Sequence, residues 1–260
     1  MTGPVGLAGL VFQVAIGGTL IAGARRRDGA VIVNAVVALG AALVPTVLGS
    51  ALGTDGVAGV RSVLSLWLGL AGFLHCLGML GWYESVPWWD HVTHVVSATL
   101  VAALVYAGLL AGGRQSPVVA TLTVGGTTLL ATLAAGVFWE LVELFARDLG
   151  ERFGVDPVLV YYGWRDTVFD LGFDVFGAAV VVALDVRLFV PLAERFPAAT
   201  DALLLGGASV VVVGILVLSA VVWLSDESSL PAPSDDASDG PEASPTQIQQ
   251  PEEGDGETDD

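Results

Sequence analysis

Long runs of apolar residues, separated by short polar stretches, organise most of this chain. About 20 consecutive apolar residues are enough for a helix to span the hydrocarbon core of a bilayer. The pattern predicts seven such helices, at about residues 5–24, 30–53, 62–83, 93–112, 117–145, 168–190 and 202–224. We therefore predict an all-α fold, a polytopic membrane helix bundle of about seven transmembrane helices.

The last part of the chain differs sharply from the rest in composition. Residues 225–260 hold 12 of the 27 acidic residues, no basic residue and few apolar ones. Such a segment cannot bury enough apolar surface to fold, so we expect a disordered acidic tail after a transmembrane domain at 1–224. All ten basic residues are arginine. An acidic chain without lysine is typical of a salt-accumulating halophile, and a GC-rich genome is the alternative explanation for the arginine.

Arginine placement gives the expected orientation in the membrane. With the N-terminus outside, the predicted internal loops carry six arginines and the external loops four. The internal ones are Arg25, Arg26, Arg27, Arg147, Arg152 and Arg165. The positive-inside rule then predicts a multi-pass protein of the cell membrane, with the N-terminus outside and the acidic tail in the cytoplasm.

Ionisable side chains interrupt three of the predicted helices near the ends that should meet one membrane face. They are Asp90 and His94, Glu140 and Glu143, and Asp170 and Asp174, one pair on each helix. Each such group costs roughly 2.5–3.5 kcal/mol at the bilayer centre, so its presence needs a reason. We predict that the six groups face one cavity, with Arg147 or Arg165 at its rim. At least one carboxylate from each helix should lie within about 8 Å of another.

The residue types in this group indicate a metal site. Carboxylates with an imidazole suit Mg²⁺, Mn²⁺ or Zn²⁺, and helix bundles build such sites from pairs spaced i,i+3 or i,i+4. A divalent metal ion is therefore the expected cofactor, held by all six residues. A metal-dependent hydrolase or transferase acting on an envelope lipid would use His94, Glu140, Glu143 or Asp170 as its acid or base.

Two other readings fit the same residues. The protein could be a proton- or cation-coupled transporter of a small solute, or a structural membrane protein whose carboxylates pair with histidine and arginine. The expected partners are the lipid bilayer and a lipid or small-molecule substrate. Nucleic acid is excluded as a partner by the net charge of −17 and the scarcity of basic residues.

Three further residues within the apolar runs carry weaker signals. His91 is expected at the membrane interface rather than in the ligand set. His75, in the middle of the third run, predicts either a helix-to-helix hydrogen bond or part of a proton path. Cys76, the single cysteine, is expected to be an apolar packing residue.

The order of these motifs resembles a known family. Asp90-x-x-x-His94, Glu140-x-x-Glu143, and Arg165 ahead of Asp170-x-x-x-Asp174-x-x-Gly177 resemble the YjdF-like integral membrane proteins and, more distantly, the VanZ-like superfamily. The resemblance covers residues of about 60–195 and implies a polytopic membrane protein without an assigned reaction. Asp174 stands where the VanZ-like pattern often has Asn, which adds one negative charge.

Overall fold

The computed structural model of the chain describes residues 3–51, 55–112, 124–155, 157–159 and 161–227. All regular elements among these residues are helical, which confirms the predicted fold class. Six helical segments are long and apolar enough to cross a membrane. They are α1 (Pro4–Arg26), α2 (Gly29–Ala51), α3 (Ala58–Leu77) with its continuation, α5 (Trp89–Gly112), α7 (Val124–Phe153) and α10 (Pro197–Glu227). The continuation of α3 comprises a π-helical turn, η2 (Gly78–Trp82), and α4 (Tyr83–Ser85).

The seventh long helix, α8 (Trp164–Ala183), has an apolar outer side and an acidic inner side. Phe169 and Phe176 are 62% and 57% exposed, whereas Asp170 and Asp174 are buried at 2% and 4%. This is the distribution expected of a helix with lipid on one side and protein on the other. α8 is not among the six segments that are long and apolar enough to cross a membrane, so the seventh predicted span stays a prediction.

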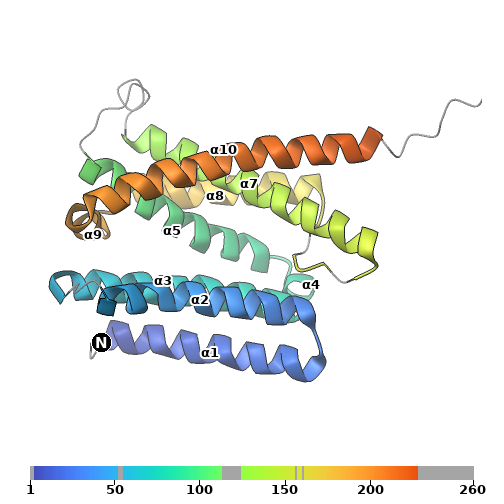
Figure 1. Cartoon of the computed structure of the whole chain (residues 1–260), viewed down its shortest axis with the longest axis horizontal. Helices are drawn as coiled ribbons and strands as arrows, with labels where there is room; N and C mark the ends of the chain where they lie inside the picture. Colours follow the sequence, from blue (N-terminus) through green and yellow to red (C-terminus); the bar gives the residue numbers. More distant parts are fainter. Residues whose placement is uncertain (1–2, 52–54, 113–123, 156, 160, 228–260) are drawn as a thin grey trace, which may run out of the picture.

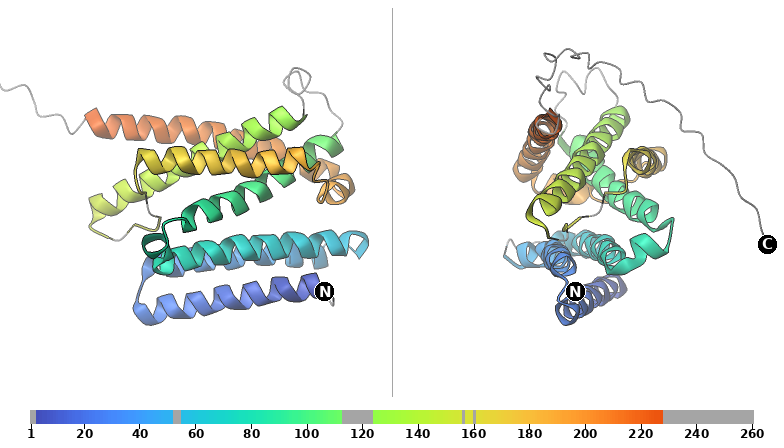
Figure 2. Two further views of the ribbon diagram at one scale, coloured as in Figure 1. Left: turned by 180° about the vertical axis from the view of Figure 1, so that it is seen from behind. Right: turned by 90° about the vertical axis from the view of Figure 1, so that its right-hand side faces the viewer.

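The long helices form two groups that lie side by side (Figure 1). α1, α2 and α3 pack on one another, and α5, α7, α8 and α10 form the second group, in which α5 and α8 share the most extensive contact. Figure 2 shows the same division from behind and from the side. Contacts of α3 with α5 join the two groups.

Each group has its own apolar core. One cluster lies around α5 and α8 and includes Leu100, Tyr106 and Val181, together with Phe189 from the segment after α8. The other lies between α1, α2 and α3 and comprises Ile16, Ala35, Ala42 and Cys76. Cys76 is fully buried there, in the packing role expected of it. Much of the remaining apolar surface is exposed; Leu203 and Leu205 on α10, for example, are 75% and 72% exposed and face outward, as lipid-facing residues do.

Two helices differ in extent from the sequence prediction. The run expected at 117–145 forms α7 from Val124 to Phe153, and residues 117–123 lie outside the described part of the chain. The helix expected at 168–190 ends instead at Ala183. Asp185 takes a left-handed backbone conformation (φ 49°), which cannot continue a helix, and the short helix α9 begins at Val190 (Val190–Arg195). A further short element, the 3₁₀ turn η1, covers Asp55–Val57 ahead of α3.

A polar clamp holds the turn after α8. The Tyr106 hydroxyl of α5 donates to Asp185 Oδ1 at 2.7 Å, and Arg187 Nε contacts both carboxylate oxygens at 2.9 and 2.8 Å. The hydrogen bond from Arg187 lowers the pKa of Asp185 below its ordinary value. This clamp lies near the C-terminal end of α5, far along the helix from Asp90.

Alternation of the helices brings several termini to one end of the bundle, which we call the α4 end (Figure 1). The end of α3, the start of α5, the end of α7, the start of α8 and the end of α10 all lie there. The opposite end holds the starts of α1 and α3. The polar positions picked out by the sequence on α5, α7 and α8 therefore fall at the same end of the molecule.

The first prediction concerns this topology. In a Cys76→Ser background, Glu84→Cys beside α5 and Ser238→Cys in the tail should react with a membrane-impermeant thiol reagent from the same side. Gly59→Cys, at the exposed start of α3 where a Cβ meets no neighbour, should react from the other side. Intact and inside-out vesicles separate the two cases. Labelling of Ser238→Cys together with Gly59→Cys would contradict the topology.

Candidate metal centre

Acidic and histidine side chains gather where the first turns of α5 and α8 meet α7. Asp90 and His94 lie one turn apart on α5, as do Asp170 and Asp174 on α8, so each pair shares one helix face. Glu140 lies opposite them on α7. Apart from Asp90, which is partly exposed, each of these residues is at most 8% exposed. Five polar side chains from three helices are thus packed together inside the bundle.

His94 is at the centre of this group. Its Nδ1 lies 3.1 Å from Asp174 Oδ1, within hydrogen-bond distance. Its Nε2 faces the other way, 3.8 Å from Asp90 Oδ1 and 3.9 Å from Glu140 Oε1. A neutral imidazole that donates its Nδ1 proton to Asp174 keeps a free electron pair on Nε2, directed at the other carboxylates.

Three of these residues meet the spacing of a metal-ligand set. Each of Asp90, His94 and Asp170 offers one donor atom, and the three atoms lie within 4.8 Å of one another. The arrangement brings α5 and α8 together at one point. Two of the three residues, His94 and Asp170, are buried. The donor set of two carboxylates and one imidazole suits a divalent cation such as Mn²⁺ or Zn²⁺.

Glu140 carries an unpaired buried oxygen. Its Oε1 has no hydrogen-bond partner and is shielded from solvent, while the nearest imidazole nitrogen, Nε2 of His94, lies 3.9 Å away. That separation exceeds a hydrogen bond. A buried carboxylate oxygen without a hydrogen bond is unfavourable, and among the described contacts the His94 imidazole is the ion-pair partner of this atom.

His91 joins the group, although the sequence placed it at the interface instead. Its Nδ1 lies 3.1 Å from Asp170 Oδ1, and its ring stacks on Phe173 with centroids 4.5 Å apart and planes at 20°. The side chain is 26% exposed, so it sits at the edge of the centre. The spacing that selected His94 gave no sign of His91, because its contact depends on how α5 is rotated against α8.

Glu143 and Arg147 make their hydrogen-bond and ion-pair contacts within α7. The Glu143 carboxylate accepts a hydrogen bond from Trp139 Nε1 of its own helix at 2.8 Å. Arg147 lies 3.6 Å from Glu151 and over the ring of Tyr161. Among the described residues no arginine, Arg165 included, forms an ion pair with Asp90, Glu140, Asp170 or Asp174. An arginine at the rim of the centre and a ligand role for Glu143 therefore stay predictions.

Two glycines allow the helices to approach closely at the centre. A Cβ built on Gly136 of α7 would collide with the carboxylate of Asp174. A Cβ on Gly177 of α8 would lie 2.8 Å from Thr99 Oγ1 and 3.0 Å from the Val95 carbonyl oxygen of α5. Small residues at helix contacts are how membrane helices pack tightly. Here they let the acidic stripe of α8 lie against both neighbours.

A second polar group lies between α2 and the π-turn. His75 makes two hydrogen bonds, with Tyr83 Oη at 2.7 Å from Nδ1 and with Asn34 Oδ1 at 3.0 Å from Nε2. The helix-to-helix hydrogen bond that the sequence offered as one reading of His75 is present. Asn34 and Tyr83 were missed, although a lone asparagine inside an apolar helix is itself a signal for a buried polar contact.

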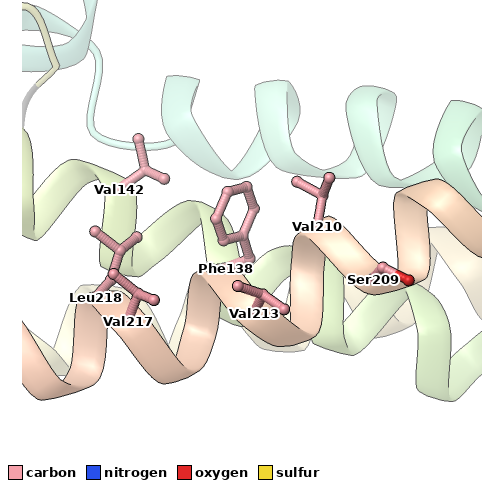
Figure 3. A pocket seen from close by; sticks show the side chains of 8 residues that line it. Phe138, Val142, Ser209, Val210, Val213, Val217 and Leu218 are labelled. Carbon is pink, nitrogen blue, oxygen red and sulfur yellow. The ribbon is translucent and has the colours of Figure 1, made fainter.

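An apolar groove on the described surface lies away from these polar groups. It has a volume of about 620 Å³ and runs between α7 and α10, where it is lined by apolar side chains such as Phe138, Val213 and Val217 (Figure 3). Phe138 and Val142 are its contribution from α7, and Glu140 is not part of its lining. A groove of this kind on a lipid-facing surface has the chemistry of an acyl-chain contact and belongs to no polar site.

These features define a polytopic helical membrane protein with a polar centre at one end of its bundle. Residues 7–190, more than half of the chain, match a family model described as "Predicted membrane protein (DUF2238)". The chain belongs to this family, whose function is unknown. The match includes α1 and α2 besides the motif-bearing region of about 60–195. No curated protein and no solved structure matches the chain. The more specific resemblance to YjdF-like and VanZ-like proteins stays a prediction.

The packing at Gly136 gives the second prediction. Gly136→Ala should lower the melting temperature of the detergent-solubilised protein, because the added methyl group collides with Asp174 and overpacking costs about 1–3 kcal/mol. Gly172→Ala on α8 is the control, since a Cβ there meets nothing within 4 Å. Thermal unfolding followed by circular dichroism measures both. Equal melting temperatures for the two variants would contradict the close α7–α8 contact.

Proposed function

We propose that the protein is a metal-dependent hydrolase or transferase that acts on an envelope lipid at the α4 end of the bundle. The observation that carries this proposal is the convergence of donor atoms of Asp90, His94 and Asp170 within 4.8 Å. Three protein ligands with room for water or substrate at a further position are the usual form of a catalytic metal site. The proposed cofactor is one divalent cation.

The surroundings of His94 support a metal on its Nε2. Metal-binding histidines almost always donate their other ring N–H to a carboxylate or carbonyl group, which fixes the tautomer and strengthens the ligand. The 3.1 Å contact between His94 Nδ1 and Asp174 is an arrangement of this type. Asp174 is accordingly assigned to orient His94, and Asp90 and Asp170 are assigned as ligands beside it.

The charge balance of the centre also favours a cation. Asp90, Glu140, Asp170 and Asp174 bring up to four negative charges, and the described residues within ion-pair distance are only histidines. Burying several carboxylates without a compensating charge is unfavourable, and each would tend to bind a proton instead. A divalent cation removes much of this cost while leaving the carboxylates charged.

Glu140 has the position of a general base in this scheme. Its Oε1 has no hydrogen-bond partner and is 3.9 Å from the nitrogen that would hold the metal, so it would lie beside a water bound to that metal. A divalent cation would make such a water acidic near neutral pH. Glu140 would accept the proton as the water oxygen bonds to the phosphorus or carbonyl carbon, and would return it to the departing oxygen as that bond breaks.

The position of the centre in the membrane points to a lipid as substrate. Aromatic side chains surround the α4 end, and Trp88, Tyr162 and Trp164 are exposed there by 57%, 46% and 71%. Tryptophan and tyrosine concentrate at the depth of lipid headgroups. A centre at this depth meets the polar part of a lipid from within the bilayer plane. From the arginine distribution, we propose that the α4 end lies on the cytoplasmic side of the membrane.

A proton- or cation-coupled transporter is the second candidate, and one feature of α7 favours it. Thr128, Thr132, Gly136 and Glu140 follow one another at i,i+4 spacing and all are buried. They form a small, partly polar stripe that leads from the centre toward the opposite end of the bundle. The threonine hydroxyls donate to carbonyls one turn back in α7, at 2.9 Å each, which a structural role alone would also produce.

The third prediction tests the metal itself. Protein purified without chelator should contain one divalent ion per chain by elemental analysis, and Asp170→Asn should lose it while keeping the helical circular-dichroism spectrum. Asp174→Asn should bind the ion about 10–100-fold more weakly, as expected when the carboxylate behind a metal-binding histidine is lost. Glu143→Gln is the matched control and should bind as the natural protein does. Pure protein free of metal that drives pH-dependent solute flux in vesicles would favour the transporter.

The fourth prediction distinguishes between a general base and a metal ligand as the role of Glu140. Glu140→Gln should retain the metal but reduce turnover of a lipid-phosphate or lipid-ester substrate by about 10²–10⁴-fold, the usual contribution of a general base. The measurement is product release by protein in mixed micelles, with Glu143→Gln again as control. Loss of metal in Glu140→Gln would make Glu140 a fourth ligand. Undiminished turnover with metal retained would refute its role as base.

A further inference from the structure

A continuous chain of hydrogen bonds runs beside the centre, between α2, α3 and the segment that leads into α8. Asn34 Nδ2 donates to the Val158 carbonyl oxygen at 2.6 Å and to the Ala30 carbonyl oxygen at 2.9 Å. Asn34 Oδ1 lies 3.0 Å from His75 Nε2, and His75 Nδ1 lies 2.7 Å from the Tyr83 hydroxyl. These short links connect α2 with the residues before α8 and with the end of α3, where His75 and Tyr83 are eight residues apart.

The protons in this chain have one consistent arrangement. Both donor contacts of Asn34 go to carbonyl oxygens, so the atom facing His75 is its carbonyl oxygen, which only accepts. Neutral His75 therefore carries its proton on Nε2 and accepts with Nδ1. The Tyr83 hydroxyl must then donate to His75. The Tyr83 oxygen keeps its electron pairs for a donor on its other side.

The backbone around Tyr83 is built to hold it in this place. Tyr83 follows the π-helical turn η2, in which Gly81 has a φ of 112° that a residue with a Cβ rarely adopts. A Cβ on Gly78 would collide with the Tyr83 ring, so the ring lies against the glycine backbone. π-Helical turns often mark functional positions, because they re-aim a side chain at the cost of regular hydrogen bonding.

On its other side Tyr83 faces the centre. Thr93 of α5 is the next polar neighbour of its hydroxyl. Thr93 Oγ1 in turn lies 2.7 Å from the Asp90 carbonyl oxygen and 3.2 Å from Asp90 Oδ1. From α7, Trp139 contacts the His75 ring edge-on, and the Trp139 indole N–H donates a hydrogen bond to Glu143. His94 on α5 is the other titratable group that faces His75.

We propose that Asn34, His75 and Tyr83 form a proton relay that serves the Asp90–His94–Asp170 centre. A proton donor at the centre gives its proton to the Thr93 oxygen, Thr93 passes its hydroxyl proton to the Tyr83 oxygen, and Tyr83 passes its own hydroxyl proton to His75 Nδ1. Tyr83 ends neutral, and His75 becomes an imidazolium whose two N–H groups bond Tyr83 and Asn34. The reverse transfer restores the starting state. The relay rests on the proposed metal centre, and it assigns Tyr83 and His75 as positioning residues for that site.

The three histidines of the chain make a direct test possible. Full-length protein in detergent, labelled with ¹⁵N in its histidine rings, gives six ring-nitrogen resonances, and His75→Gln, His91→Gln and His94→Gln assign them. Without metal, His75 should show the neutral tautomer protonated on Nε2. Zn²⁺, which is diamagnetic, should shift the His94 resonances directly and the His75 Nδ1 resonance through Tyr83.

Tyr83→Phe should abolish the shift of His75 on Zn²⁺ addition while His94 still responds. Tyr106→Phe is the matched control, since it removes a hydroxyl with an equally short 2.7 Å hydrogen bond at the opposite end of the bundle. Thr93→Val, which keeps the branched shape, breaks the same path at its next link and serves if Tyr83→Phe does not fold.

The outcomes separate the two proposals. No response of His94 to Zn²⁺ would overturn the metal centre, and with it the role given to the relay. A response of His94 with no response of His75 in the natural protein would overturn the relay alone. A His75 response that survives in both Tyr83→Phe and Thr93→Val would likewise refute it, because the perturbation would not pass through these hydroxyls.

Discussion

Carboxylates buried in a membrane protein must be neutralised, and in this chain that requirement falls on a few contacts of His94. The imidazole lies between Asp174 on one side and Asp90 and Glu140 on the other, at 3.1, 3.8 and 3.9 Å. Water is absent from the hydrocarbon region and arginine is not at hand among the described residues near the centre. The packing of α5, α7 and α8 follows from this constraint, because only their close approach lets one histidine serve three helices. The same requirement is the reason for which we propose a bound cation at this centre.

The helices can approach closely at the centre because glycines stand at two of their contact positions. Gly136 on α7 and Gly177 on α8 have no side chain where Asp174 and the backbone of α5 would otherwise be displaced. Farther along, apolar side chains take over, and the core of Leu100, Tyr106 and Val181 holds the same helices together. Polar contacts therefore fix the rotation of the helices at the α4 end, and apolar packing supports them over the rest of their length.

The sequence predicted the helical fold well, because membrane helices are marked by long apolar runs whose length is set by the bilayer. It also placed Asp90, His94, Glu140, Asp170 and Asp174 on the right helices, and i,i+4 spacing gave each pair its face. Glu143 is not one of the three residues whose donor atoms lie within 4.8 Å of one another. Positions i and i+3 differ by about 60° around a helix, and Glu143 accepts a hydrogen bond from Trp139 of its own helix. The partners of long side chains such as Arg147 and Arg165 depend on packing that residue spacing alone does not give.

Contacts that depend on irregular backbone or on the docking of distant helices could not be predicted from the sequence. The link of Tyr83 to His75 requires the π-turn, and the two glycines of residues 78–82 permit an irregular backbone there without specifying a π-turn. The bond of Asn34 to the Val158 carbonyl joins segments more than a hundred residues apart, so it depends on how the two groups of helices dock. The early end of α8 depends on a single left-handed residue, Asp185.

The most direct test of the proposed metal centre is whether a metal bound to the protein is coordinated by one imidazole. Purified protein loaded with Mn²⁺ is suited to electron spin echo spectroscopy, which detects the magnetic coupling between the metal and a ligating nitrogen. Labelling the three histidines with ¹⁵N distinguishes a ring nitrogen from any other. A metal held at the Asp90–His94–Asp170 centre should show coupling to a single histidine nitrogen, lost in His94→Gln and retained in His75→Gln. A spectrum of Mn²⁺ with water ligands only, unchanged by His94→Gln, would show that this centre does not bind the metal.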